Sequence, residues 1–229
     1  MEKKAAIYHF TDGSNKRPIV YLKELERIKL FASNIGYSNA DLYVDKSLRQ
    51  CDHVKLEELM HNIDYYNALL LKDFYHLRLN TGAAMAELVK LSHRKIEIHT
   101  IEDGDFLFTT PPLDTALNVA IYYCGLEVIG HSIELQYQIM DLFVKEKTKW
   151  KVIDRYADIA GNRVDGSQKK IQKLIENKHK YDLILVQSFG SLHWRTSKFC
   201  KLRHEIQRDI YSMHEDVYLK YESVKENIK

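Results

Sequence analysis

The sequence repeats a set of short motifs at a spacing of about 114 residues, which is the size of a whole domain rather than of a solenoid unit. In order along the chain, the matched segments are AAIY at 5–8 and VAIY at 119–122, LYVD at 42–45 and RYAD at 155–158, and ALLL at 68–71 and LILV at 183–186. The third segment of each set is followed by a Phe and then by Leu-x-x-x-Thr. The sequence therefore predicts two copies of one domain in one polypeptide, arranged as an intramolecular dimer.

Composition limits the class of protein. The 229 residues are 45% hydrophobic and 29% charged, so each half can bury an ordinary core, and three Pro and nine Gly argue against disordered or fibrous classes. No apolar run approaches the roughly 20 residues of a membrane span, and the first residues lack the apolar stretch of a signal peptide. Cys51, Cys124 and Cys200 are odd in number and widely spaced, which indicates reduced thiols. We therefore expect a cytoplasmic protein without a membrane partner.

Charge is nearly balanced overall but uneven along the chain. The 34 basic and 32 acidic residues give a net charge of +2, which is not typical of a dedicated nucleic-acid binder. From Asn118 onward there are 19 Lys and Arg against 15 Asp and Glu. The basic excess lies at Lys145, Lys147, Lys149 and Lys151, and at Lys169, Lys170, Lys173, Lys178 and Lys180. This pattern fits either a solvated helix surface or a patch that binds DNA weakly.

Hydrophobic periodicity predicts an α/β fold. In the first half we expect strands at 5–10, 41–45, 68–72, 96–101 and 106–110, and helices at 19–34, 54–63 and 81–91. In the second half we expect strands at 119–124, 152–156, 183–187 and 209–214, and helices at 133–147, 167–177 and 196–205. Alternating strands and helices indicate two tandem domains, each a mostly parallel sheet of four to five strands flanked by helices.

Prolines and charge suggest the domain boundaries. Pro111-Pro112 interrupts regular structure, so we place the first copy at 1–110, a linker at 111–117 and the second copy at 118–217. Residues 218–229 form a charged tail whose apolar spacing suggests a short helix.

The order of the motifs resembles the catalytic domain of serine recombinases, the resolvases and DNA invertases. The resemblance rests on Ala-Ile-Tyr, SIELQ at 132–136, YADIAG at 156–161, LILV at 183–186 and the Leu-x-x-x-Thr segment, in that order. The first copy shows it through AAIY, LYVDKS at 42–47 and HLRLNTG at 76–82. The likeness spans nearly all of each half, and it implies the family's α/β fold and a connection with DNA recombination.

The residues that the family uses for chemistry are largely replaced. The family opens with Tyr-x-Arg-x-Ser, in which Ser attacks a DNA phosphodiester and Arg stabilises the phosphate charge. The matched positions hold Phe10 and Asp12 in the first copy, and Cys124 and Leu126 in the second. Phosphoryl transfer needs fixed positive groups around the phosphate, and Asp12 would repel it.

The family's second cluster, Asp-Arg-Leu-x-Arg, is also lost. Residues 75–79 read YHLRL and residues 190–194 read GSLHW, so only Leu77 and Leu192 match. Asp45, Asp158 and Gln136 match positions that the family keeps, but they cannot replace a nucleophile and its arginines.

Other candidates for chemistry are weak. Ser14 lies two residues beyond the nucleophile position, but no Arg flanks it. Ser132 is better explained as the N-cap of the helix that follows it. Cys124 is better explained as an inert thiol at the end of a strand. The histidines form no HxH or HxxxH pair, and no Gly-rich phosphate loop is present. We therefore predict no catalytic, metal-binding or cofactor-binding residues.

These observations favour a catalytically inactive serine-recombinase-like protein. It would act as an interaction or regulatory module linked to DNA recombination or a mobile element. The sequence does not choose its protein partner, which could be an active recombinase, another protein or a second copy of itself. Two alternatives stay open. One is a DNA-binding recombinase or nuclease with an active site relocated to Ser14 or Cys124, and the other is a small-ligand binding α/β protein that uses the sheet edges.

Overall fold

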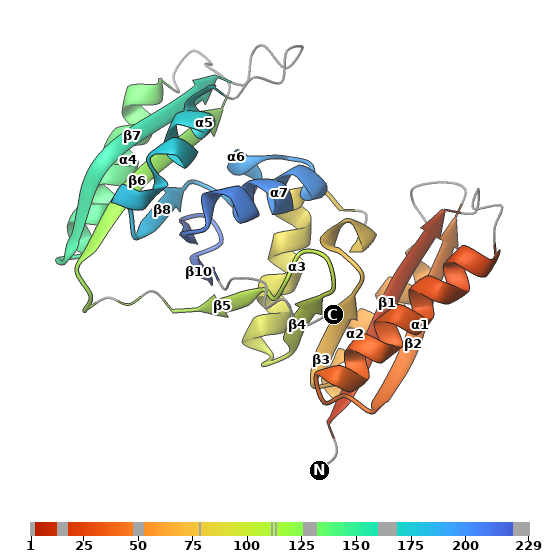
Figure 1. Cartoon of the computed structure of the whole chain (residues 1–229). Helices are drawn as coiled ribbons and strands as arrows, with labels where there is room; N and C mark the ends of the chain where they lie inside the picture. The colour runs from red at the N-terminus through yellow and green to blue at the C-terminus, as the bar shows by residue number, and fades with distance from the viewer. Residues whose placement is uncertain are drawn as a thin grey trace. The chain divides into compact units, whose positions relative to one another are not determined.

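The computed structural model describes residues 3–12, 18–47, 53–77, 79–110, 112, 114–125, 132–159 and 169–221. By its internal contacts the chain divides into one unit that ends at Leu107 and a second that begins at Phe108. Each unit is an α/β unit with its own sheet (Figure 1). No helix in the described ranges is long and apolar enough to cross a membrane.

The first unit is built on a four-stranded parallel sheet. Its strands are β1 (Lys4–Asp12), β2 (Asn39–Ser47), β3 (Ala68–Leu71) and β4 (Glu97–Thr100), in the order β2-β1-β3-β4. All three strand pairs are parallel. Tyr8 lies opposite Tyr43 on one side and Leu71 on the other. β1 and β3 therefore end at the same edge of the sheet.

Helices cover the two faces of this sheet. They are α1 (Pro18–Asn34), α2 (Val54–His61) and α3 (Thr81–His93), with short 3-10 turns η1 (Ile63–Tyr65) and η2 (Phe74–Leu77). Ile28 of α1 packs in a core cluster with Ile7, while the Tyr8 hydroxyl reaches the carboxylate that caps α2. Because successive side chains of a strand point to opposite faces, α1 and α2 lie on opposite faces of the sheet.

Two helix ends follow signals in the sequence. The Asn80 side chain accepts a hydrogen bond from Ala83 N at 3.0 Å and caps α3. After α1, Gly36 has a φ of +94°, and Tyr37 N donates to Ala32 O at 2.8 Å. This backward bond closes the helix because glycine adopts the left-handed conformation without steric cost.

The second unit has a six-stranded sheet in the order β5-β10-β9-β8-β6-β7. The strands are β5 (Leu107–Thr109), β6 (Leu117–Gly125), β7 (Trp150–Ile159), β8 (Leu183–Val186), β9 (Asp209–Ser212) and β10 (Val217–Lys220). The pairs β6–β7, β6–β8 and β8–β9 are parallel, and β9–β10 is antiparallel. The predicted α/β class with mostly parallel sheets is confirmed.

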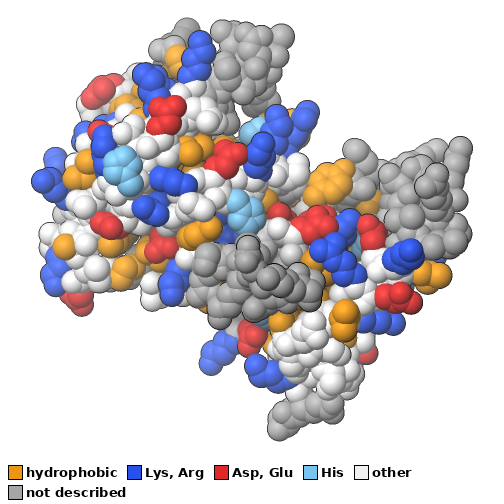
Figure 2. Space-filling view, in the orientation of Figure 1, with side chains coloured by type: hydrophobic (Ala, Val, Ile, Leu, Met, Phe, Trp, Pro, Cys, Tyr) orange, Lys and Arg blue, Asp and Glu red, His pale blue; other side chains and the backbone are white. Residues whose placement is uncertain are grey.

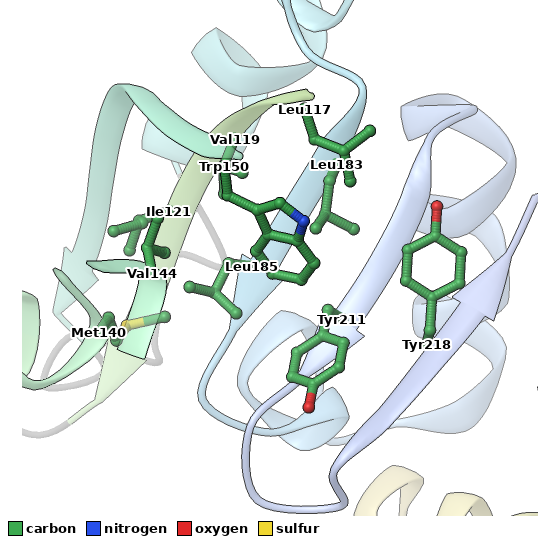
Figure 3. Packing of buried hydrophobic residues seen from close by; sticks show 10 residues of the cluster. All are labelled: Leu117, Val119, Ile121, Met140, Val144, Trp150, Leu183, Leu185, Tyr211 and Tyr218. Atoms are coloured by element: carbon green, nitrogen blue, oxygen red, sulfur yellow. The ribbon is translucent and has the colours of Figure 1, made fainter. Parts of the chain in front are cut away.

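The helices of this unit are α4 (Ile133–Glu146), α5 (Lys169–Glu176), α6 (Phe189–Leu192) and α7 (Thr196–Ile206), with the 3-10 turn η4 (Lys178–Lys180). Figure 3 shows the core on one face of the sheet, where side chains of β6, β7, β8, β9 and β10 meet Met140 and Val144 of α4. The rings of Trp150 and Tyr211 meet edge to face there, with centroids 5.8 Å apart.

Two expectations need correction. The tail expected to form a short helix instead begins within a strand, because residues 217–220 form β10; residues 222–229 lie outside the described residues. Asp216, with a φ of +50°, lies in the turn that brings β10 back beside β9. The strand expected at 106–110 does not join the first sheet, because β5 lies at the edge of the second.

Candidate functional site

The positions that match the family's nucleophile region lie at the carboxyl end of the first strand in each unit. Phe10 is buried, 6% exposed, with its ring centroid 6.0 Å from that of His53. Cys124, its counterpart, is half-buried and is not in a disulfide. The side chain of Asp12, and all of Ser14, Arg78 and Leu126, lie outside the described residues. At the described positions, no guanidinium group stands where the family has its first arginine.

The second cluster lies after the third strand of each unit. Leu77 and Leu192 are buried, as expected for a structural position. Beside them, His76 and Ser191 occupy the first arginine position. Trp194 occupies the second arginine position of the second unit and is 53% exposed. The guanidinium of the next residue, Arg195, lies 4.8 Å above its ring, a basic group that sequence reasoning did not single out.

Asp45, retained from the family pattern, is fully engaged in hydrogen bonds. It is buried, and its carboxylate accepts from Tyr8 Oη at 3.0 Å, from Lys55 N at 2.9 Å and from Leu56 N at 3.0 Å. The two backbone donors belong to the first turn of α2, where a carboxylate also favours the helix dipole. Asp45 therefore joins β1, β2 and α2.

Asp158 does the same in the second unit. It accepts from Tyr122 Oη at 3.1 Å, and from Lys170 N and Ile171 N at 3.0 Å each. Burial of Tyr122, with Cys124 and Asp158 close by, raises the pKa of its phenol far above the usual range. In each unit the matching Asp therefore accepts a hydrogen bond from a tyrosine of the first strand and from two backbone N–H groups of a helix.

A second hydrogen-bonded network is also present in both units. In the first, Tyr66 Oη donates to Asp41 at 2.7 Å and lies 2.7 Å from Tyr43 Oη. In the second, Tyr181 Oη donates to Asp154, and the Tyr156 and Tyr181 hydroxyls lie 2.6 Å apart. The network connects the second strand with the residue that precedes the third strand.

Within the ranges that the structure describes, the first unit carries a cluster of ionisable groups at its sheet edge. The cluster consists of His9 on β1, Glu24 on α1, and Lys72, Asp73 and His76 after β3. His9 Nε2 lies 3.7 Å from Glu24 Oε2, and Lys72 Nζ lies 2.7 Å from Glu24 Oε1. His76 Nδ1 lies 2.7 Å from Asp73 Oδ1, and the two imidazole rings are 4.7 Å apart. We call these five residues the edge cluster.

Burial sets the protonation of the edge cluster. His9 is 1% exposed, and burial together with the neighbouring His76 lowers its pKa from 6.5 to about 4. Burial alone would raise the pKa of Asp73, but the hydrogen bonds from His76 and the charges of His76 and Lys72 together lower that pKa. Burial likewise opposes the charge of Lys72, yet its bond to Glu24 raises the pKa. His9 therefore stays neutral at pH values at which an exposed histidine becomes protonated.

The second unit replaces every member of this cluster with a neutral residue. The matching residues are Tyr123, Gln136, Gln187, Ser188 and Ser191. Gln136 is buried where Glu24 lies in the first unit, and Ser188 Oγ lies 3.1 Å from Ser191 Oγ. Sequence analysis missed the edge cluster because its members are far apart in the chain, although the adjacent parallel strands β1 and β3 bring their ends together.

The remaining sequence candidates have ordinary surroundings. Ser132 Oγ accepts a hydrogen bond from Leu135 N at 3.1 Å, which confirms it as the N-cap of α4. Cys200 is buried and is not in a disulfide, and Cys51 lies outside the described residues. In the described ranges, no three His, Cys, Asp or Glu side chains are grouped so that they could hold a metal ion.

On the face of the molecule that Figure 2 shows, the basic side chains of the described residues do not form one continuous surface. Lys178 Nζ donates to Glu205 O at 2.7 Å, and Lys149 Nζ lies 3.6 Å from Asp114 Oδ1. Figure 2 shows basic and acidic side chains interspersed.

Comparison with solved structures finds recombinase catalytic domains and sugar-binding proteins. The N-terminal catalytic domain of TP901-1 integrase is similar at 16% identity, with a TM-score of 0.38, over 64% of this chain and 97% of that one. A resolvase family site-specific recombinase from Streptococcus pneumoniae is similar at 13% identity, with a TM-score of 0.39, over 75% of this chain and 97% of that one. A periplasmic solute binding protein of an ABC transporter from Actinobacillus succinogenes, with bound D-allose, is similar at 10% identity, with a TM-score of 0.28, over 80% of this chain and 68% of that one. No protein-family model matches the sequence, and neither does any curated protein.

Proposed function

We propose that the chain is a tandem, catalytically inactive resolvase-like protein that acts in the cytoplasm as an interaction or regulatory module in DNA recombination. The observation that carries the proposal is the chemistry of the sheet edges. In both units the described positions that match the family's phosphate-binding arginines hold Phe10, His76 and Leu79, or Cys124, Ser191 and Trp194. Without guanidinium groups at these positions, the charge that develops on a phosphate in transfer lacks the partners that the family supplies there.

The proposed duplication is supported by matched details inside the two units. The Tyr8–Asp45 bond with its two backbone donors recurs as Tyr122–Asp158 with two backbone donors. The Asp41, Tyr43 and Tyr66 network recurs as Asp154, Tyr156 and Tyr181. Unrelated domains of the same general class have no reason to share two side-chain networks at the same places in the strand order.

The experiment that tests the lost chemistry uses supercoiled plasmid. The full chain is incubated with plasmid in the presence and absence of Mg²⁺, alongside an active serine recombinase as the positive control. We expect neither nicked plasmid nor a covalent protein–DNA adduct that survives denaturation. An adduct would refute the proposal, and mass spectrometry of the linked peptide would then decide between Ser14 and Cys124.

DNA affinity measured against salt tests whether the basic residues of the second half contribute. Phosphate contacts make log K fall linearly with log salt, by about 0.9 for each phosphate neutralised. We expect a slope corresponding to no more than about two contacts, because the charges of both signs are interspersed. A slope of about six or more would assign the chain to direct DNA binding instead of protein interaction.

A further inference from the structure

The outward face of α4 carries a stripe of apolar side chains. Leu135, Ile139 and Leu142 are 41%, 44% and 60% exposed, and their spacing of four and three places them on one side of the helix. The opposite side buries Met140 and Val144 in the core. Since α4 is apolar on both sides, the outward stripe indicates a second partner in addition to the sheet.

Exposed apolar side chains in this unit concentrate around the same helix. Among the described residues from Phe108 onward, the large apolar side chains that are exposed all lie on α4 or β7, apart from Trp194. Those on β7 are Ile153 and Ile159. The guanidinium of Arg155 on β7 binds both carboxylate oxygens of Asp141 on α4 at 2.8 Å, so the helix and the strand are held together. Figure 1 shows α4 beside β7.

The first unit does not repeat the stripe. Ile28 and Ala32 of α1 pack in its core as Met140 and Val144 of α4 do in the second, which aligns the two helices. In that alignment Lys23 and Arg27 replace Leu135 and Ile139, and only Leu30 matches Leu142. A feature needed only to build the domain would be present in both units, so the stripe has a separate purpose.

We propose that the stripe on α4 is the contact between two copies of this chain, with the two helices packed antiparallel about Ile139. Glu134 and Lys145 lie eleven positions apart on one flank of the stripe, about three helical turns. In an antiparallel pair with two-fold symmetry, this flank meets its own copy in the opposite direction, so each Glu134 faces a Lys145 of the second copy. A parallel two-fold pair would bring opposite flanks together, and Glu134 would not meet Lys145 of the second copy, so these charges favour the antiparallel pair.

The small area of the stripe limits the affinity of the dimer. A stable dimer buries roughly 800 Å² on each partner, and three side chains provide only part of such an area. Ile153 and Ile159 are exposed on β7, the strand beside α4. The contact is expected to give a dimer with a dissociation constant on the order of micromolar. This inference does not depend on the proposed loss of catalysis, which the plasmid experiment tests separately.

Sedimentation of the full chain from about 1 to 200 µM, a range that brackets micromolar affinity, tests the proposal. The double variant Leu135→Lys/Ile139→Arg introduces the residues of the first unit at two exposed positions. It should raise the dissociation constant by about 100-fold or more. Leu30→Lys, at an equally exposed position of α1, is the matched control and should leave the dimer unchanged. Circular dichroism confirms that each variant is folded.

The charges test the orientation. Glu134→Lys and Lys145→Glu should each weaken the dimer about 10-fold, and the variant with both changes should restore it, because the opposite charges meet again across the two-fold axis. A wild-type chain that is monomeric over the whole concentration range overturns the proposal. The stripe would then be a contact for another protein. A dimer that persists in Leu135→Lys/Ile139→Arg, or that is not restored by the double charge exchange, also overturns it.

Discussion

Acid should weaken the first unit through His9. This histidine is 1% exposed, and its pKa is lowered to about 4, whereas the unfolded chain keeps the ordinary value of 6.5. The groups that face it are His76, Glu24, Lys72 and Asp73. Above pH 6.5 the imidazole is neutral in both the folded and the unfolded chain, so the titration of His9 does not change the free energy of unfolding. As the pH falls from 6.5 to 4, the unfolded chain takes up a proton that the folded chain does not, and the free energy of unfolding decreases.

The size of the effect follows from the two pKa values. A pKa difference of one corresponds to 1.36 kcal/mol, so the gap between 6.5 and about 4 gives about 3 kcal/mol in full. About 2 kcal/mol of this loss is reached at pH 5. The variant His9→Phe removes the titrating group and keeps an aromatic ring beside His76. Between pH 7.5 and pH 5.0, the wild type should lose about 2 kcal/mol more than this variant.

Hydrogen exchange is the suitable assay. Both tryptophans, Trp150 and Trp194, lie in the second unit, so fluorescence monitors only that unit. The exchange of peptides from β1 and β3 reports on the first unit. His214→Gln, at a histidine whose side chain is 79% exposed, is the control and should behave as wild type. Equal losses in the wild type and His9→Phe would refute the reasoning.

The titration of His99 changes the stability of the first unit in the opposite direction, but it does not affect the comparison between the wild type and His9→Phe. Burial disfavours its charge, but the hydrogen bonds and charges of Asp105 and Glu97 together raise its pKa. Its contribution to stability is therefore present at low pH and lost as the pH rises. Because it is the same in both proteins, the difference between the wild type and His9→Phe isolates His9.

Three further predictions concern the second unit, each measured by urea unfolding with tryptophan fluorescence. Asp158→Ala removes the acceptor for Tyr122 Oη and two backbone N–H groups, and should lower the free energy of unfolding by about 2–4 kcal/mol; a loss under 1 kcal/mol would contradict the capping function. Tyr181→Phe removes the donor to Asp154 and should cost about 1–2 kcal/mol, and an unchanged midpoint would show that the network adds no stability. Ser132→Ala should cost about 1 kcal/mol through loss of the N-cap, while Ser132→Asp should retain most of the stability; equal losses in the two variants would argue against capping.

Periodicity predicted the parts of the fold that local patterns determine. Fully apolar segments such as 68–71 and 183–186 became buried central strands because both of their faces are covered. The amphipathic pattern at 19–34 gave α1 nearly to the residue, and Gly36 ended it. In these segments the sequence pattern and the tertiary environment favour the same structure.

The rest depended on contacts that the local pattern does not contain. Residues 217–220 begin a charged tail whose apolar spacing suggested a helix, but pairing with β9 makes them a strand. β5 has only three residues, and its place in the second sheet is set by tertiary pairing. The edge cluster required the register of β1 against β3, which places Tyr8 opposite Leu71 and so brings Lys72 and Asp73 close to His9.

The place of β5 in the sheet order determines how the two halves can be separated. A fragment that starts at residue 118 would omit β5 and leave β10 as an outer strand with its backbone donors and acceptors exposed. Such an uncovered edge invites pairing with other chains, so that fragment should precipitate. A division just before Leu107 instead keeps β5 beside β10. The polypeptide should therefore be divided there when each half is expressed alone.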